Sequence, residues 1–460
     1  MMSNIYKDLD EKRFGWFHLK SMITTGMGVF TDGYDLSSIG LVLLLVLSFY
    51  GINKKSPDYS LVTSLVAGSA LIGAAVGAIV FGELSKRGRK KFYGVDVAIL
   101  GIGALLQAFS PNIAFLIVIR FVLGLGVGAD YVLSPMIMAE HSNSRDRGKT
   151  IAFGFGLMWG FGATLAAAVY LVMAPFVSTN ILWRIVLAAG AIPALAVVYL
   201  RRKMPETPRF IARIAGDKDK FVNEVKYIAN KEIKINGDLK DKNTFKYYFK
   251  KYAGFYITAM ILWFLYDQIA YSSILFGPSL IASGLGIPSD IFQFVMELAF
   301  TIPGGIVAVS LIDRVGRKPL QVSGFILMGI FLLSFGILKD FSLLPAFLGL
   351  ILYGMQNFAN QYGPGSISAS GMLGVELAPT KIRSQIQSYT VAAGRTGASI
   401  SSFVFPYMFI ALGESFAFYY LTALAIVAGI LTWLIIPETK GSLEKTSGEI
   451  NEMRNIEVAQ

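Results

Sequence analysis

Long apolar runs separated by short polar stretches repeat from one end of the chain to the other. Each run holds about 20 residues, the length of helix that crosses a hydrocarbon layer of roughly 30 Å. The pattern predicts twelve membrane-crossing helices, at residues 22–49, 60–82, 92–110, 113–138, 150–175, 182–200, 252–282, 291–312, 320–338, 343–372, 384–411 and 416–436. The predicted class is an all-α membrane protein.

Composition and charge agree with this class. Hydrophobic residues make up 54% of the chain and charged residues 15%, against roughly a quarter charged in soluble domains. The net charge of +11 could indicate a nucleic-acid partner, but Lys and Arg gather in alternate loops, as topology signals do. These basic stretches are residues 7–20, 86–91, 145–149, 201–251, 314–318 and 381–383. We expect no nucleic-acid partner, a place in the plasma membrane and both termini on its cytoplasmic side.

Cysteine is absent and histidine occurs twice, as His18 and His141. This excludes thiolate metal sites and cysteine nucleophiles. Since no nucleophile–base pair or metal-ligand cluster occurs either, we expect no enzymatic activity, no metal and no cofactor. The polar start of the chain lacks the apolar core of a cleavable signal, so we expect the first span to direct insertion. Any proton that crosses with a cargo must travel on carboxylates.

Three short motifs occur twice at nearly constant spacing. The pairs are Lys86–Lys90 with Arg314–Lys318, Pro205–Pro208 with Pro437–Lys440, and Glu140–Arg147 with Glu376–Arg383, at offsets of 228, 232 and 236 residues. A shared spacing indicates two homologous halves. We therefore predict an N-terminal six-helix half (1–203), a cytoplasmic central loop (204–250), a C-terminal six-helix half (251–437) and a cytoplasmic tail (438–460).

Two homologous six-helix halves are the organisation of major facilitator transporters, whose substrate site lies between the halves near the bilayer midplane. The repeat offset pairs Asp35 with Asp267 and Trp159 with Arg395. We predict that the members of each pair face each other across a central cavity.

Asp267 lies near the middle of the seventh span, in the string "WFLYDQIAY". A charge at the centre of a span costs roughly 2.5–3.5 kcal/mol, and such residues usually face a cavity or a partner. Trp263 and Tyr271 lie four residues before and after it, on the same helix face. Asp267 either caps an unwound segment or, as we predict, carries a proton that it releases when water reaches it. Tyr271 would then offer its hydroxyl to the substrate and Trp263 a wall.

Two aspartates of the first span, Asp32 and Asp35, lie one helical turn apart in "FTDGYDLSSIG". Either could bond a neighbouring helix instead of carrying a proton. Only Asp35 has a partner in the repeat, so its functional interpretation is the stronger of the two.

Asp130 and Tyr131 end a glycine-rich stretch of the fourth span. We interpret Gly124, Gly126 and Gly128 as helix-packing positions rather than a phosphate cradle. At 1.5 Å per residue, Asp130 is predicted to lie slightly to the cytoplasmic side of the bilayer centre. That position suits a proton acceptor.

Arg395 is the central cation of the C-terminal half. It either pairs with Asp267 or Asp35 without touching substrate or, as we predict, grips an anion through its planar guanidinium. We expect the other charged residues of the spans to pair structurally, Arg120 and Glu297 with other helices and Asp96 with the basic loop.

Several of these strings resemble one family. "GADYVLSPMIMAE" at 128–140 resembles the fourth span of the phosphate:proton symporter family of major facilitators, and "GMGVFTDGYDLSSIG" at 26–40 resembles its first span. The Trp263, Asp267 and Tyr271 spacing resembles its seventh span, and "FANQYGPG" with the stretch 376–383 is similar to its tenth. The resemblance covers essentially the whole chain. It implies that Asp35 and Asp130 lie on the proton path, and it implies roles in substrate binding and coupling for Tyr131, Trp263, Asp267 and Tyr271.

The chain departs from this family at three places. Trp159 stands where the family carries glutamine, Arg395 where it carries lysine, and the loop "SKRGR" at 85–89 lacks the usual aspartate. An indole offers one donor where an amide offers two donors and an acceptor. "DGYDLSSIG" also resembles the first span of proton symporters for organic acids.

We therefore predict a proton-coupled symporter of a small anion that works as a monomer by alternating access. Inorganic phosphate is the first choice of cargo and an organic carboxylate the second. A sugar is third, because Trp159 and Trp263 could stack on a pyranose. A non-transporting substrate sensor would carry a long signalling extension, and the tails are short. The predicted substrate residues are Tyr131, Trp159, Trp263, Asp267, Tyr271 and Arg395, and the predicted proton carriers are Asp32, Asp35, Asp130 and Asp267.

Overall fold

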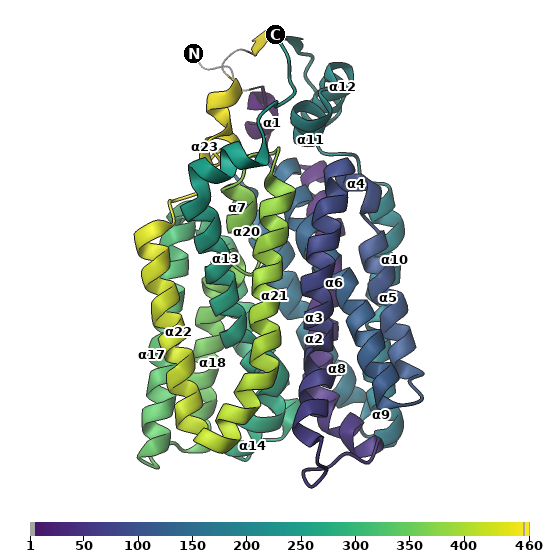
Figure 1. The fold of residues 1–460 in the computed structure, drawn as a ribbon, viewed down its shortest axis with the longest axis vertical. Helices are drawn as coiled ribbons and strands as arrows, with labels where there is room; N and C mark the ends of the chain where they lie inside the picture. The colour runs from purple at the N-terminus through teal and green to yellow at the C-terminus, as the bar shows by residue number, and fades with distance from the viewer. Residues whose placement is uncertain (1–4, 454–455, 460) are drawn as a thin grey trace.

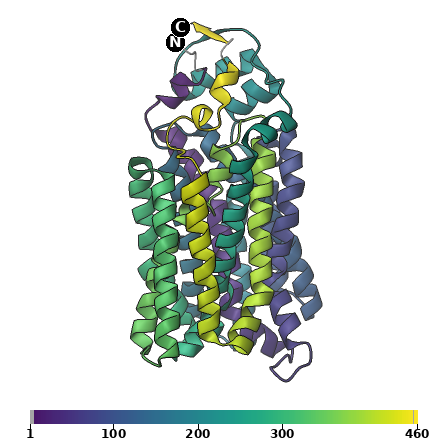
Figure 2. The same cartoon turned by 60° about the vertical axis from the view of Figure 1, so that its left-hand side comes forward.

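The computed structural model describes residues 5–453 and 456–459. Its long helices run side by side in one bundle, with the N-terminal helices (purple and blue) beside the C-terminal ones (green and yellow) (Figure 1). A smaller layer of short helices and a strand pair covers the end of the bundle to which both ends of the chain return (Figure 2).

The N-terminal half crosses the bundle six times, in part through consecutive helices that form one rod. Its elements are α2 (Trp16–Phe49), α3 (Tyr59–Leu84), η1 (Ser85–Arg87), α4 (Arg89–Phe92), α5 (Val95–Ala108), α6 (Ile113–His141), α7 (Arg147–Ile151), the π-helical turn η2 (Ala152–Leu157), α8 (Met158–Met173), α9 (Thr179–Ala189) and α10 (Ala191–Arg202).

The C-terminal half repeats this plan. Its elements are α13 (Phe245–Phe276), the π-helical turn η4 (Gly277–Ile281), α14 (Ala282–Leu285), α15 (Ser289–Val295), the π-helical turn η5 (Met296–Thr301), α16 (Ile302–Val315), α17 (Arg317–Asp340), α18 (Ala346–Tyr362), α19 (Pro364–Ile367), α20 (Met372–Glu376), α21 (Arg383–Tyr407), η6 (Met408–Leu412) and α22 (Glu414–Ile435).

Ten helical segments in the described part of the chain are long and apolar enough to cross a membrane. The other two are α18, which has 17 residues, and α21, which carries arginine, serine and glutamine along its length. With α18 and α21, these ten segments confirm the predicted twelve crossings, six in each half. The predicted span 343–372 was too long: α18 ends at Tyr362 because Gly363 and Pro364 follow it, and proline disfavours helix in the residue before it.

Glycines bring α3 and α6 into close contact. A Cβ on Gly124 would lie 2.0 Å from the carbonyl oxygen of Ala70, and one on Gly128 would lie 2.0 Å from that of Ala74. A Cβ on Gly126 would lie 2.6 Å from the carbonyl oxygen of Asp96. The interpretation of these glycines as packing positions is therefore confirmed, since the helices could not approach this closely with any side chain there.

The repeated motifs form two matching ion-pair clusters that join the halves at the end nearest the termini. In the first, Glu140 accepts hydrogen bonds from Arg89 of its own half at 3.2 Å and from Arg383 of the other half at 2.7 Å. Thr207 donates its hydroxyl to the same carboxylate. The motifs recognised by their spacing thus meet in space.

The second cluster is built around Glu376 in the same way. It accepts from Arg317 of its own half at 2.9 Å and from Arg147 of the other half at 2.8 Å, and Thr439 donates its hydroxyl. Burial raises the pKa of Glu376, but Arg317 and Arg147 outweigh burial and hold that pKa below its ordinary value. Glu376 is therefore ionised at neutral pH and keeps the halves together.

The covering layer contains α1 (Lys7–Asp10), α11 (Pro208–Phe210), η3 (Ile211–Ala215), α12 (Lys218–Ala229), β1 (Lys234–Asn236), α23 (Leu443–Thr446), η7 (Glu449–Met453) and β2 (Glu457–Ala459). β1 pairs antiparallel with β2. Arg209 joins the ends of the chain, because its guanidinium donates to Asp10 at 2.8 Å and to Glu444 at 2.6 Å. The central stretch and both ends of the chain are thus held as one layer.

Candidate functional site

A cavity of about 60 Å³ lies between the two halves. The N-terminal half contributes residues of α6, η2 and α8 to its wall, and the C-terminal half contributes residues of α13, α15, η5, α18 and α21. Its main polar and aromatic lining residues are Tyr131, Phe155, Trp159, Tyr266, Asp267, Tyr271, Ser273, Gln293, Glu297, Thr301, Asn357, Asn360, Gln361 and Arg395. A site between the halves is where the repeat places a substrate.

Asp267 is bonded on both carboxylate oxygens. Trp263 Nε1 donates to Oδ1 at 3.0 Å, and Arg395 Nη1 donates to Oδ2 at 3.1 Å. The same nitrogen of Arg395 donates to the Tyr271 hydroxyl at 2.5 Å. Asp267, Tyr271 and Arg395 line the cavity, whereas Trp263 is fully buried behind its wall. Trp263 thus orients Asp267, and this structure does not place it where the cargo would lie.

Arg395 crosses from α21 toward the N-terminal half. Its guanidinium carbon lies 4.1 Å from the ring centre of Tyr131, a distance at which a cation is attracted to an aromatic face. Arg395 Nε has no hydrogen-bond partner. Arg395 therefore pairs with Asp267 and also lines the cavity. Its contact with an anion stays a prediction.

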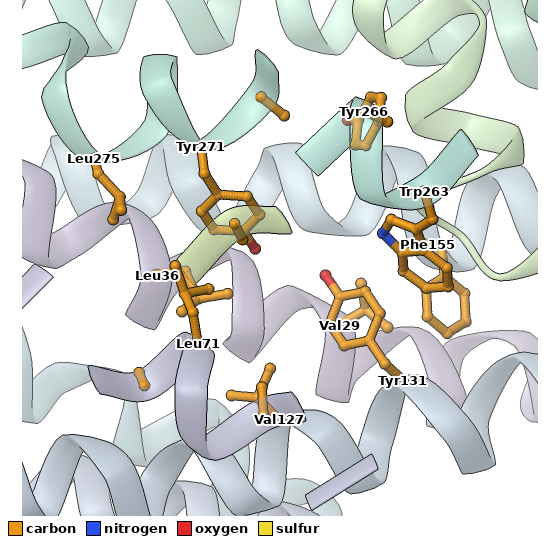
Figure 3. Close-up of a cluster of buried hydrophobic side chains, with 14 of the residues drawn as sticks. Val29, Leu36, Leu71, Val127, Tyr131, Phe155, Trp263, Tyr266, Tyr271 and Leu275 are labelled. Carbon is orange, nitrogen blue, oxygen red and sulfur yellow. The ribbon is translucent and has the colours of Figure 1, made fainter. Parts of the chain in front are cut away.

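The aromatic rings gather on one side of the site. The ring of Tyr131 of α6 lies beside those of Trp263 and Phe155 (Figure 3), with ring centres 6.0 and 5.8 Å away. Gly394 makes room for Trp263, because a Cβ there would lie 2.4 Å from the indole Cδ1. Glycine before Arg395 is therefore needed for the indole to reach Asp267.

Trp159 and Arg395 line the cavity from opposite halves, as the repeat predicted. Asp35, the repeat partner of Asp267, does not line it. A Cβ on Gly190 would lie 2.2 Å from Asp35 Oδ1, so Asp35 packs against the junction of α9 and α10 within its own half. The prediction that Asp35 faces Asp267 across the cavity was wrong, because the packing of α2 turns this residue toward the N-terminal helices.

The remaining aspartates of the N-terminal half lie outside the cavity. Asp130 Oδ1 accepts from Arg201 Nη1 at 2.6 Å and from the Ser134 hydroxyl, while Oδ2 has no partner. The same Arg201 nitrogen lies 2.7 Å from Asp96 Oδ2. Asp32 is fully buried, and neither of its carboxylate oxygens has a hydrogen-bond partner. Arg201, which the sequence did not single out, is the cation of this group.

The structure adds several polar residues to the site that sequence reasoning missed. Tyr266 donates its hydroxyl to Asn360 Oδ1 at 2.7 Å. Gln361 Nε2 lies 2.6 Å from where a Cβ on Gly156 would be, and it has no hydrogen-bond partner. Polar residues clustered in the apolar run "YGMQNFANQY" were the available signal. Glu297, expected to pair with another helix, lines the cavity instead.

Comparison with known proteins identifies the family of the chain. The family model described as "Sugar (and other) transporter" matches residues 21–452. "Probable inorganic phosphate transporter 1-6" of Arabidopsis thaliana is 33% identical, over 97% of this chain and 96% of that protein. "Inorganic phosphate transporter 1-11" of Oryza sativa subsp. japonica is 34% identical, over 96% and 89% of the two chains.

Solved structures show the same fold. The proton:xylose symporter XylE bound to 6-bromo-6-deoxy-D-glucose superposes with a TM-score of 0.78 at 21% identity, covering 94% of this chain and 99% of that one. The inward-open conformation of the xylose transporter XylE from E. coli superposes with a TM-score of 0.70 at 22% identity, covering 94% and 99%.

Proposed function

Since the chain belongs to the sugar (and other) transporter family, we propose that it moves inorganic phosphate across a membrane together with protons, by alternating access. The similar proteins named above as inorganic phosphate transporters match it over nearly their whole length. We further propose that the membrane is the plasma membrane, that both termini are cytoplasmic, and that the transporting unit is a monomer.

The observation that carries this proposal is a small cavity with an arginine in its wall. Arg395 offers an unpartnered Nε and Gln361 an unpartnered amide nitrogen, Nε2, and Asn360 and Tyr271 also line the space. Guanidinium groups recognise oxyanions through directed, charge-assisted hydrogen bonds. Trp159 stands where the resembled family carries glutamine, so the N-terminal half offers no amide at that position. Gln361 supplies an amide to the cavity from the C-terminal half instead.

The charge in the cavity wall favours phosphate over a sugar. Arg395 is the cation of that wall among the described residues, and a guanidinium forms charge-assisted hydrogen bonds with an oxyanion that a neutral sugar hydroxyl does not offer. An organic carboxylate is the second candidate, because Trp159 and Phe155 give the cavity an aromatic wall that suits a short carbon chain.

Proton coupling follows from the pair between Asp267 and Arg395. When Asp267 is ionised it occupies Arg395 Nη1 at 3.1 Å, and an arriving anion must compete with it. Protonation of Asp267 removes the competing charge and frees the guanidinium for the anion. Proton and phosphate therefore bind together more strongly than either binds alone.

We propose Tyr131, Trp159, Asp267, Tyr271 and Arg395 as substrate residues, with Trp263 orienting Asp267. Asp32, Asp35 and Asp130 are proposed as proton carriers of the N-terminal half, since buried carboxylates within spans usually mark ion pathways. The clusters around Glu140 and Glu376 must part for release at the end of the bundle nearest the termini. The closed clusters would then hold the cavity away from that side until the cargo is bound.

Counterflow in proteoliposomes tests the function. Vesicles preloaded with phosphate should accumulate labelled phosphate from outside. An imposed inward proton gradient should also drive uptake of labelled phosphate into vesicles that contain no phosphate. Sulfate, small organic carboxylates and sugars are tested as competitors. Exchange of an organic carboxylate or a sugar with no exchange of phosphate would transfer the assignment to that cargo.

A further inference from the structure

Glu297 is a second carboxyl group in the cavity wall, and the proposed cycle does not use it. Its side chain lines the cavity and the residue is 5% exposed. Gln293 Nε2 donates to Oε1 at 2.8 Å, and Oε2 has no hydrogen-bond partner. Within the described chain no lysine or arginine forms an ion pair with it, unlike Asp267, which has Arg395.

The backbone at Glu297 is shaped to present this side chain. It lies in η5, a π-helical turn between α15 and α16, where Thr301 donates its hydroxyl to the carbonyl of Met296 at 3.2 Å. Single π-helical turns inside helices often occur at functional sites, because the extra residue changes the direction of the side chains. The π-helical turn and the cavity lining thus both involve Glu297, whose Oε2 has no hydrogen-bond partner.

The charges around the cavity limit the state in which Glu297 can accept an anion. Asp267 and Arg395 offset each other, so an ionised Glu297 would leave the empty site with a net negative charge. In the loaded site Asp267 is protonated, so Arg395 balances only one of the negative charges that an ionised Glu297 and a bound oxyanion would bring, and unpaired buried charges are costly. An anion and Glu297 can share this cavity only with a proton between them.

Neighbouring groups do not offer Glu297 another cation. The elements packed against η5 bring Tyr353 and Tyr362 from α18, Tyr170 from α8 and Asp290 from α15, while Asp313 and Arg314 lie at the far end of α16. The cavity adds the phenols of Tyr131, Tyr266 and Tyr271 to the pair of Asp267 and Arg395. Arg395 is the cation of the cavity wall among the described residues, and Asp267 already engages it.

We propose that Glu297 holds the bound oxyanion through one shared proton, with Oε2 on one side and an anion oxygen on the other. The proton arrives from water or on the phosphate itself, and no bond to phosphorus forms or breaks. Phosphate thereby enters the cavity with a proton at Glu297 in addition to the one on Asp267. This inference rests on the proposed function and deepens it, since it names the protonated form of the cargo site.

The test compares phosphate binding to the purified full-length parent and to Glu297→Gln across a series of pH values, by calorimetry. The amide donates a hydrogen bond without taking up a proton. The plot of log Kd against pH for the variant should differ in slope from that of the parent by roughly one, which is one proton fewer per phosphate bound. Titration of phosphate itself is common to both proteins and cancels in the difference.

Two further variants make the outcome specific. Glu297→Asp keeps an ionisable group and should keep the parent slope with weaker binding. Glu414→Gln makes the same chemical change at a carboxylate outside the cavity wall, where Glu414 Oε2 lies 2.8 Å from Lys339 Nζ. This variant should match the parent. If Glu297→Gln does not purify as a folded protein, sulfate supplies the readout, because it keeps its charge through the neutral range. Uptake of about two protons per sulfate bound to the parent, one at Asp267 and one at Glu297, then supports the shared proton.

Equal slopes for the parent and Glu297→Gln, or sulfate binding to the parent with uptake of no more than one proton, would overturn the shared proton while the phosphate assignment stands. An equal change of slope in Glu414→Gln would also overturn it. Absence of phosphate binding to the parent at every pH would instead overturn the proposed function, and the inference with it.

Discussion

Arg201 Nη1 lies 2.6 Å from Asp130 Oδ1 and joins the last turn of α10 to the middle of α6. The same nitrogen serves Asp96, so one cation is shared by two buried carboxylates. A proton that reaches Asp130 would weaken only one of these two bonds. Asp130 can therefore change charge while Arg201 stays anchored on Asp96.

Removing Arg201 should cost more stability than neutralising Asp130. Arg201→Met leaves two buried carboxylates without a cation, and such losses are on the order of 3–5 kcal/mol. Asp130→Asn leaves Arg201 on Asp96 and should cost less. In a double-mutant cycle followed by thermal unfolding in detergent, the two changes together should cost less than their sum, with a coupling of roughly 0.5–3 kcal/mol. Additive costs would show that the pair has no direct coupling.

Neutralising Asp267 should separate binding from coupling. Asp267→Asn keeps the shape of the side chain but carries no proton and leaves Arg395 free, so phosphate counterflow should persist while proton-driven accumulation is lost. Uptake into proteoliposomes with and without an imposed proton gradient measures both. The control is Asp340→Asn, whose carboxylate accepts from Tyr419 at an exposed site. Full accumulation by Asp267→Asn would remove this residue from the proton path.

Shortening the reach of the Arg395 fork should weaken anion binding. Arg395→Lys keeps the charge but loses directed N–H groups, and we expect a loss of roughly 1–3 kcal/mol in phosphate affinity. Arg395→Gln should be worse, because Asp267 then lacks its cation. Binding is measured by calorimetry, with Arg314→Lys as the same change at an exposed position. Parent-like affinity in both variants at Arg395 would make the residue structural and remove the main support for an anion.

Replacing Trp159 should distinguish the two leading cargoes. If the cargo is phosphate, Trp159→Gln adds two donors and an acceptor to the cavity wall and should preserve or improve uptake. If the cargo has a carbon chain or a ring, the lost contact should cost on the order of 1–3 kcal/mol. We expect the first result in labelled phosphate uptake, with Trp433→Gln, 65% exposed, as control. A large loss of phosphate uptake by folded Trp159→Gln would favour an organic anion.

Breaking the cluster around Glu376 should open the end of the bundle nearest the termini. Glu376→Gln leaves Arg147 and Arg317 facing each other without their shared carboxylate, so the halves should separate there. Because the chain has no cysteine, spin labels on Arg87→Cys and Arg314→Cys can report the distance between the halves directly. The label distance should lengthen in Glu376→Gln and stay unchanged in Glu83→Gln, since Glu83 pairs with Lys86 of its own half. An unchanged distance in both would show that this cluster does not hold the halves closed.

The twelve crossings, the duplication and the central aspartate could all be recognised in the amino-acid order. These features can be recognised because a membrane constrains the sequence. Each crossing needs about 20 apolar residues, and a charge within a crossing must face a cavity or a partner. Helical spacing alone put Trp263, Asp267 and Tyr271 on one face. Asp267 and Tyr271 line the cavity, and Trp263 bonds Asp267 from behind its wall. The repeat likewise paired Trp159 with Arg395 correctly.

The rotation of each helix about its axis was decided only by packing. Asp35 turns toward the junction of α9 and α10, Trp263 sits behind the cavity wall, and Arg201 reaches Asp130 from another helix. Gln361 and Glu297 enter the cavity because of Gly156 opposite and the π-helical turn η5. A helix buried on most sides carries little amphipathic pattern to show which face meets the cavity. That face follows from contacts between helices far apart in the chain, which exist only in the folded protein.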